Sequence, residues 1–231
     1  MWYKIKRIYV GDNYLVYPQW KPWANTIVYL PLNSTNTKND IKWHTTAQWW
    51  TVRYWTYWGV DCADFTRWWY VTISSISFPA EWTLVVWANN INGNNASWWY
   101  WWAVFWTKSD NTSLKNPWLY YWNSSSSNWY FWFEPDTYFN VNTKSKWYML
   151  AIRMSSSTKK GYLFWESSYK EIDISQSTVL SATWLSYIWW RTDRNDRLFY
   201  WYISQFIIEN RLWSIQDLTD MFNSMKKWYW Y

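Results

Sequence analysis

Short runs of alternating apolar and polar residues recur along the whole chain, and polar or turn-forming residues separate them. Alternation with a period of two is typical of strands that bury one face. On this basis we predict strands at residues 3–10, 14–17, 27–32, 52–57, 62–65, 70–73, 83–88, 129–133, 138–141, 147–154, 162–164, 171–175, 185–188 and 198–208. The Asn- and Ser-rich segments 89–95 and 123–128 are predicted loops. So many short strands predict an all-β protein built from two packed antiparallel sheets.

One segment near the end of the chain has helical rather than strand spacing. Ser214 and Asp217 have the spacing of a capping box, in which a hydroxyl and a carboxylate bind the free amides at a helix start. Apolar residues then follow at steps of three and four, namely Ile215, Leu218, Phe222 and Met225. This spacing predicts a short C-terminal helix with one apolar stripe that packs against a sheet.

The first residues of the chain are predicted to form a separate hairpin. Two alternating runs flank the turn sequence Gly11-Asp12-Asn13, and the second run ends at Tyr17-Pro18. We therefore divide the chain into an N-terminal β-hairpin with its linker, residues 1–24, and a sandwich domain, residues 25–231.

Composition changes this picture, because the chain has 30 tryptophans and only 4 glycines in 231 residues. Ordinary chains contain roughly 7% glycine. Many tryptophans stand where a β protein needs a turn, for example after proline at Trp23 and Trp118 and at the ends of alternating runs at Trp82 and Trp201. Glycine suits such positions because it adopts positive φ without a steric penalty.

We hypothesise that most of these tryptophans are glycines in the native protein, from a gene in which the codon UGA encodes glycine. The alternative is a protein that is rich in tryptophan. Three tryptophans lie in or beside apolar runs and are expected to be authentic: Trp87, Trp147 and Trp213. Residues 98–106 are a buried aromatic strand if their tryptophans are real and a Gly-rich segment if they are not.

The distribution of charge bears on the class of partner. The net charge is +6, but the cations are scattered, with short clusters only at residues 4–7 and 226–227. A groove that follows a nucleic-acid backbone needs cations gathered on one face, so we expect a solvated surface and no nucleic-acid partner. Stacking of tryptophans on single-stranded bases is the alternative that the composition leaves open.

Cysteine, histidine and hydropathy exclude several kinds of site. Cys62 and His44 are the only residues of their types, which excludes an intrachain disulfide, a cysteine cluster and a two-histidine zinc site. No apolar run reaches the roughly 18 residues that span a bilayer, so we expect no membrane insertion. The N-terminus shows no signal peptide.

The order of these segments resembles the concanavalin A-like lectin/glucanase superfamily, and in particular its laminin-G-like jelly-roll domains. The resemblance covers residues 25–226 and rests on 27–32 with Asp40, 63–65, 70–73, 83–87, 147–152, 162–166 and 188–218. Family members have glycine at the positions of Trp189, Trp190 and Trp201, and many carry an acidic residue where this chain has Ser204. The resemblance implies an antiparallel two-sheet jelly-roll sandwich with a short C-terminal helix.

The same resemblance implies a non-catalytic carbohydrate-binding or adhesion module with a glycan or cell-surface carbohydrate as its ligand. The predicted contacts lie in variable polar loops, at Asn92, Asn94, Asn95, Ser126, Asn128, Arg194 and Asn195. No cofactor is expected except calcium, for which the loop residues Asp193 and Asp196 supply hard oxygen ligands. The alternative, which we favour over calcium, is a solvated hairpin in which two neighbouring arginines neutralise the two aspartates.

Two other functions are kept open. The N-terminal hairpin is similar to short leaders of phage structural proteins, which suggests a component of a phage-like particle that contacts other structural proteins and binds no sugar. Either function places the protein outside the cell, at a cell surface or in a virion. Residues 171–175 resemble the carboxylate strand of glucanases, but Ser175 occupies the position of the acid/base, so we expect no enzyme.

Overall fold

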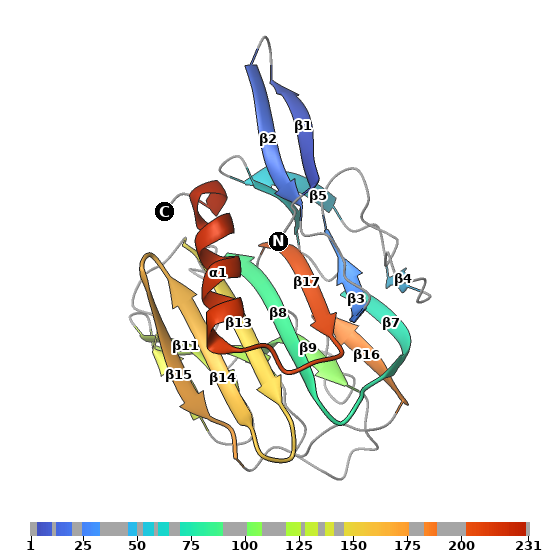
Figure 1. Ribbon diagram of the computed structural model, residues 1–231, viewed down its shortest axis with the longest axis vertical. Helices are drawn as coiled ribbons and strands as arrows, with labels where there is room; N and C mark the ends of the chain where they lie inside the picture. Colours follow the sequence, from blue (N-terminus) through green and yellow to red (C-terminus); the bar gives the residue numbers. More distant parts are fainter. Residues whose placement is uncertain are drawn as a thin grey trace.

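Two antiparallel sheets, packed face to face, form the body of the molecule (Figure 1). The computed structural model describes residues 4–10, 13–19, 25–32, 46–49, 53–57, 60–64, 70–89, 101–107, 119–125, 128–133, 137–140, 146–175, 183–188 and 202–229. Within this part of the chain, the strands are antiparallel wherever they pair, and one short helix follows the last strand. The fold class predicted from the sequence is thereby confirmed.

The larger sheet has eight strands in the described part of the chain. Its main order is β15-β14-β13-β8-β17-β6-β5, and β3 pairs with β17 off this path. The bounds are β3 (Thr26–Leu30), β5 (Arg53–Tyr57), β6 (Val60–Asp64), β8 (Trp82–Asn89), β13 (Trp147–Met154), β14 (Lys159–Trp165), β15 (Ser168–Asp173) and β17 (Tyr202–Glu209). Strand β15 is therefore the last hydrogen-bonded strand at one end of this sheet in the described part of the chain.

The second sheet has seven described strands in the order β12-β11-β10-β9-β16-β7-β4. Their bounds are β4 (Thr46–Trp49), β7 (Tyr70–Ser77), β9 (Trp101–Thr107), β10 (Leu119–Ser125), β11 (Asn128–Phe133), β12 (Thr137–Asn140) and β16 (Thr183–Ile188). Phe131 of this sheet contacts Tyr148 of the larger sheet, with ring centroids 5.5 Å apart. Both rings are buried, so this contact belongs to the core between the two sheets.

A second core lies on the other face of the larger sheet, beneath helix α1 (Ile215–Met225). In Figure 1 this helix crosses in front of β13 and β14. Alternate residues of β13, among them Trp147 and Met149, pack in one cluster with Leu218 and Phe222 of α1. Because one face of β13 meets the opposite sheet and the other meets the helix, nearly every residue of the strand is buried.

The start of α1 has the capping box that the sequence predicts. The Ser214 amide donates to Asp217 Oδ2 over 2.8 Å, and the Asp217 amide donates to Ser214 Oγ over 3.0 Å. The buried stripe of the helix contains Leu218, Met221, Phe222 and Met225, while Ile215 is half-buried and packs against the same cluster. The predicted helix and its apolar stripe are confirmed, and Met221 is added to the stripe.

A short 3-10 turn, η1 (Lys226–Tyr229), ties the end of the chain to the larger sheet. The Tyr229 ring stacks on Trp87 with a centroid distance of 3.9 Å, and its hydroxyl lies 2.6 Å from Ser204 Oγ and accepts from Gln205 Nε2. An irregularity in the pairing of β17 with β8 lies between Ile203 and Gln205. Ser204 thus holds the Tyr229 side chain against the larger sheet.

Strands β1 (Lys4–Val10) and β2 (Asn13–Gln19) form a two-stranded sheet of their own, which projects from the body in Figure 1. The predicted N-terminal hairpin is therefore present. The division of the chain into two parts at residues 24 and 25 stays a prediction.

Two loop assignments made from the sequence are wrong. Residues 123–125 belong to β10 and Asn128 begins β11, so most of the predicted polar loop pairs as a hairpin. Trp82 does not lie at a turn: it is the first residue of β8 and is fully buried, with its ring 5.1 Å from that of Phe78. In both places, tertiary pairing outweighs the local preference of polar residues or of a tryptophan beside a turn.

Candidate functional site

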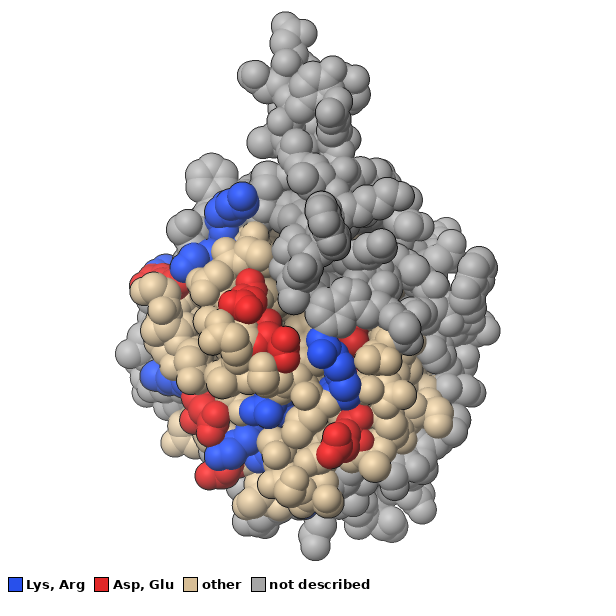
Figure 2. Space-filling view, viewed as in Figure 1, with Lys and Arg blue, Asp and Glu red and all other residues tan. Residues whose placement is uncertain are grey.

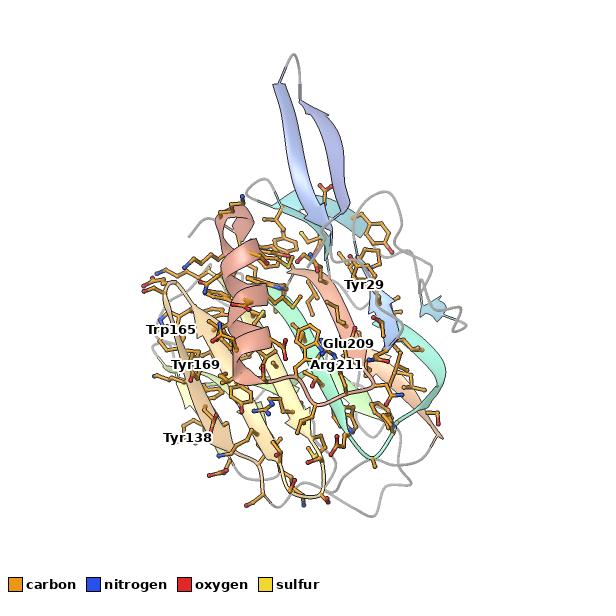
Figure 3. The ribbon with its side chains drawn as sticks, in the orientation of Figure 1. Tyr29, Tyr138, Trp165, Tyr169, Glu209 and Arg211 are labelled. Atoms are coloured by element: carbon orange, nitrogen blue, oxygen red, sulfur yellow. The ribbon has the colours of Figure 1, made fainter. Side chains whose placement is uncertain are left out.

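A row of aromatic rings crosses the outer face of the larger sheet and ends at an exposed tyrosine. Trp87 of β8 stacks with Phe222 of α1, with centroids 5.6 Å apart, and Phe222 lies 5.5 Å from Phe164 of β14. Phe164 in turn stacks with Tyr169 of β15 at 5.1 Å and an interplanar angle of 28°. Tyr169 is 45% exposed and is labelled in Figure 3 beside α1. Phe164 therefore supports one face of the Tyr169 ring and leaves the tyrosine accessible to a ligand.

The register of one hairpin places polar groups on the same face as this tyrosine. Strands β14 and β15 pair Phe164 with Tyr169, Tyr162 with Glu171 and Lys160 with Asp173. Because alternate residues of a strand share a face, the six side chains lie on the outer side of the sheet. The turn between the strands contains Glu166, which has the positive φ of 53° that glycine usually supplies.

Hydrogen bonds join these polar groups to Arg153 of β13. Lys160 Nζ lies 2.9 Å from Glu171 Oε1 and 2.7 Å from Asp173 Oδ1. Arg153 Nη1 donates to the Tyr162 hydroxyl over 2.9 Å, and the Tyr162 hydroxyl also hydrogen-bonds Glu171. We call Arg153, Lys160, Tyr162, Tyr169, Glu171 and Asp173 the outer-face cluster. Two cations, two anions, a buried hydroxyl and an exposed ring thus lie within one continuous network.

The network fixes the protonation states of the cluster. The hydrogen bond from Lys160 holds the pKa of the Glu171 carboxyl below its usual value, and the bonds to Asp173 and Glu171 raise the pKa of Lys160. Burial raises the pKa of the Tyr162 hydroxyl. At neutral pH, Glu171 is a charged acceptor, Lys160 is a charged donor and Tyr162 is a neutral hydroxyl.

We expect the pKa of Glu171 to rise toward that of an unperturbed glutamate when Lys160→Met removes the ammonium. A carboxylate with a lowered pKa stabilises the fold above its unfolded-state pKa and loses this contribution as the pH falls. Carbon-13 NMR titration of the carboxyl group measures the change. Lys159→Met is the matched control, because Lys159 Nζ donates to the Ser175 carbonyl. An unchanged Glu171 pKa in Lys160→Met contradicts the assignment of the ion pair.

The same geometry bears on the glucanase resemblance. Glu171 and Asp173 both lie on the exposed strand β15. The position that the resemblance gives to the acid/base is Ser175, which has no carboxyl group. In the structure, the carboxylates of Glu171 and Asp173 are both ion-pair partners of Lys160.

The loop residues predicted from the sequence are not brought to this cluster by any described contact. Asn128 begins β11, in the sheet opposite the outer-face cluster. The other predicted ligand and calcium residues lie outside the described part of the chain: Asn92, Asn94, Asn95, Ser126, Asp193, Arg194, Asn195 and Asp196. In the described ranges, no group of three or more metal-ligating side chains gathers, and no helix is long and apolar enough to cross a membrane.

Comparison with known proteins identifies the fold but no family. No protein-family model matches the sequence, and no curated protein matches it. Among solved structures, the receptor-binding domain of botulinum neurotoxin C/D mosaic serotype is similar, with a TM-score of 0.60, 11% identity and coverage of 87% of this chain and 51% of that chain. The ligand-binding domain of serotype D in complex with N-acetylneuraminic acid has the same TM-score, identity and coverage.

The binding domain of Paraclostridial Mosquitocidal Protein 1 is also similar, with a TM-score of 0.57, 11% identity and coverage of 87% of this chain and 52% of that chain. This chain therefore spans about half the length of each similar structure. At such low identity the likeness establishes a shared β-sandwich fold, and half-length coverage leaves the other half of those chains without a counterpart here.

Proposed function

We propose that this protein is a non-catalytic carbohydrate-binding module that acts outside the cell, at a cell surface or in a virion. The observation that carries this proposal is the geometry of Tyr169, which is supported by Phe164 on a rigid sheet and stays exposed beside Glu171 and Lys160. An aromatic ring with polar neighbours suits a sugar, because a pyranose has an apolar C–H face and a rim of hydroxyl groups.

Each part of the cluster has a role in this interaction. The exposed tyrosine packs against the C–H face of the sugar, Glu171 accepts hydrogen bonds from hydroxyl groups, and Lys160 donates to hydroxyl oxygens. Charged partners strengthen these hydrogen bonds. Because stacking on Phe164 and the pairing of Lys160 already hold the side chains, binding loses little additional side-chain entropy.

The structural neighbours support the proposal at the level of the fold. They include domains described as receptor-binding and one in complex with N-acetylneuraminic acid. The likeness covers about half of each of these neighbours. It does not indicate which half contacts the ligand. The choice of the outer-face cluster rests on its own side chains.

We expect Tyr169→Ala to weaken glycan binding by roughly tenfold or more, the effect of losing about 1.4 kcal/mol of contact. A glycan array identifies the bound sugars, and titration calorimetry measures the change. Asn210→Ala is the control, because Asn210 is exposed and directly follows β17, which three strands separate from β15 in the larger sheet. If both variants bind as the parent protein does, the ligand contacts lie elsewhere; if the parent binds no glycan, the function itself is wrong.

The structure of the N-terminus favours a second candidate, a component of a phage-like particle that contacts other structural proteins. Strands β1 and β2 pair only with one another in the described part of the chain. A two-stranded sheet is marginal in water by itself, so contact with a partner protein would stabilise it. This candidate predicts no bound sugar on the array.

A further inference from the structure

The outer-face cluster contains equal numbers of cations and anions, and this balance bears on the class of sugar that it accepts. Lys160 has both Glu171 and Asp173 as partners, and Arg153 reaches Glu171 through the Tyr162 hydroxyl. Figure 2 shows basic and acidic side chains mixed over the described part of the same face of the molecule. The described part of this face therefore presents no cationic patch.

From this arrangement we infer that the outer-face cluster binds a neutral sugar, with Tyr169 beneath its C–H face and Glu171 and Lys160 on adjacent hydroxyl groups. This inference rests on the proposed function and narrows it to uncharged hexose-type glycans. A sugar hydroxyl both donates and accepts, so it satisfies a carboxylate and an ammonium at the same time.

An acidic sugar fits the cluster less well for two electrostatic reasons. Its carboxylate would be a third anion beside Glu171 and Asp173, and like charges in contact cost several kcal/mol. It would also compete for Lys160, whose ammonium is already bound by both carboxylates at 2.9 and 2.7 Å. The Arg153 guanidinium lies over the Tyr162 ring, 5.8 Å from its centroid, and donates to the hydroxyl of that residue.

The position of the carboxylates on the sheet supports the same choice. Glu171 and Asp173 are on β15, the last strand at one end of the larger sheet, and their side chains are 40% and 72% exposed. A ligand that rests on Tyr169, two positions from Glu171, meets this carboxylate first. These two carboxylates accept hydrogen bonds from sugar hydroxyl groups, and they repel an anionic ligand.

A pair of ligands that share a lactose core, only one of which carries an acidic sialyl residue, tests the inference. We expect the full-length protein to bind lactose roughly tenfold or more tightly than 3′-sialyllactose, in titration calorimetry at low and at physiological salt. Glu171→Gln keeps the shape of the side chain and removes the negative charge. It is expected to weaken lactose binding and to reduce the preference over sialyllactose, while Asn210→Ala preserves both.

The outcomes separate this inference from the function on which it rests. Tighter binding of sialyllactose, or binding that Tyr169→Ala and Glu171→Gln both leave unchanged, overturns the neutral-sugar site while carbohydrate binding stands. Absence of binding to lactose, to sialyllactose and to every glycan of an array overturns both. Glu171 and Tyr169 are exposed, so we expect both substitutions to leave the fold intact. Thermal melting of the two variants verifies that each is folded.

Discussion

Phe222→Ala is expected to lower the free energy of unfolding by about 3–5 kcal/mol, the usual result of deleting a buried phenylalanine ring. Phe222 is 2% exposed and lies between Trp87 of the sheet and Phe164 of the hairpin, 5.6 and 5.5 Å from the two rings. Its removal leaves a cavity between helix and sheet that these large aromatic neighbours are poorly able to fill. Chemical denaturation followed by circular dichroism measures the loss.

The control for this variant lies next to it on the same helix. Asn223 is exposed, so Asn223→Ala is expected to change the unfolding free energy by no more than about 0.5 kcal/mol. Phe222 packs against Phe164, which in turn supports Tyr169. Phe222→Ala is therefore also expected to bind glycan more weakly, even under conditions in which it is fully folded. If Phe222→Ala lowers the free energy of unfolding by less than about 1 kcal/mol, the packing of α1 on the larger sheet contributes little to stability.

The sequence was most informative where a local pattern and the tertiary environment agree. Strand β13 has the predicted bounds at both ends, and the capping box at Ser214 is present. Strand β10 is not among the strands predicted from the sequence. Its end contains Asn123 and Ser124, which are polar residues typical of loops, yet they continue a strand that pairs with β11. Long-range pairing of this kind leaves little trace in a single segment of sequence.

The candidate site shows a similar limit. In the sequence, Glu171 belongs to a segment that resembles a catalytic strand, and no local pattern singles out Tyr169. Lys160 and Glu171 lie on the two strands of one hairpin and meet because a two-residue turn sets the register of β14 and β15. The aromatic row beneath Tyr169 includes Phe222, whose position depends on where the helix packs. Attention to variable polar loops follows a sound general rule, but the described sheet face has its own candidate ligand contacts.

The structure also limits the argument for misread tryptophans. In the described part of the chain, the non-glycine residues with positive φ are Leu32 and Glu166, and neither is a tryptophan. The described tryptophans therefore provide no backbone evidence for glycine. The other suspected positions, including Trp23, Trp118 and Trp201, lie outside the described residues. The buried indole nitrogen of Trp82 has no hydrogen-bond acceptor, but neither have those of Trp87 and Trp147, so this feature does not separate misread from authentic tryptophans.

Intact mass is the measurement that decides between the two readings of the chain. We expect protein purified from its own source to be lighter than the 28.9 kDa of the sequence as written, since glycine replaces a tryptophan at each recoded codon. The deficit is expected to be a whole multiple of the tryptophan–glycine mass difference, and peptide mapping then assigns each position. A mass equal to that of the written sequence contradicts the hypothesis.

The same peptide map contains its own control. Trp87 is expected to remain tryptophan, because its ring stacks with Phe222 on one element and Tyr229 on another, and glycine would remove both stacking contacts. Trp147 contacts Tyr229 edge-on at 5.1 Å and is expected to remain for the same reason. Glycine at Trp87 would remove a ring that links the sheet to α1 and η1. That result would contradict the packing of the helix even if the recoding itself were correct.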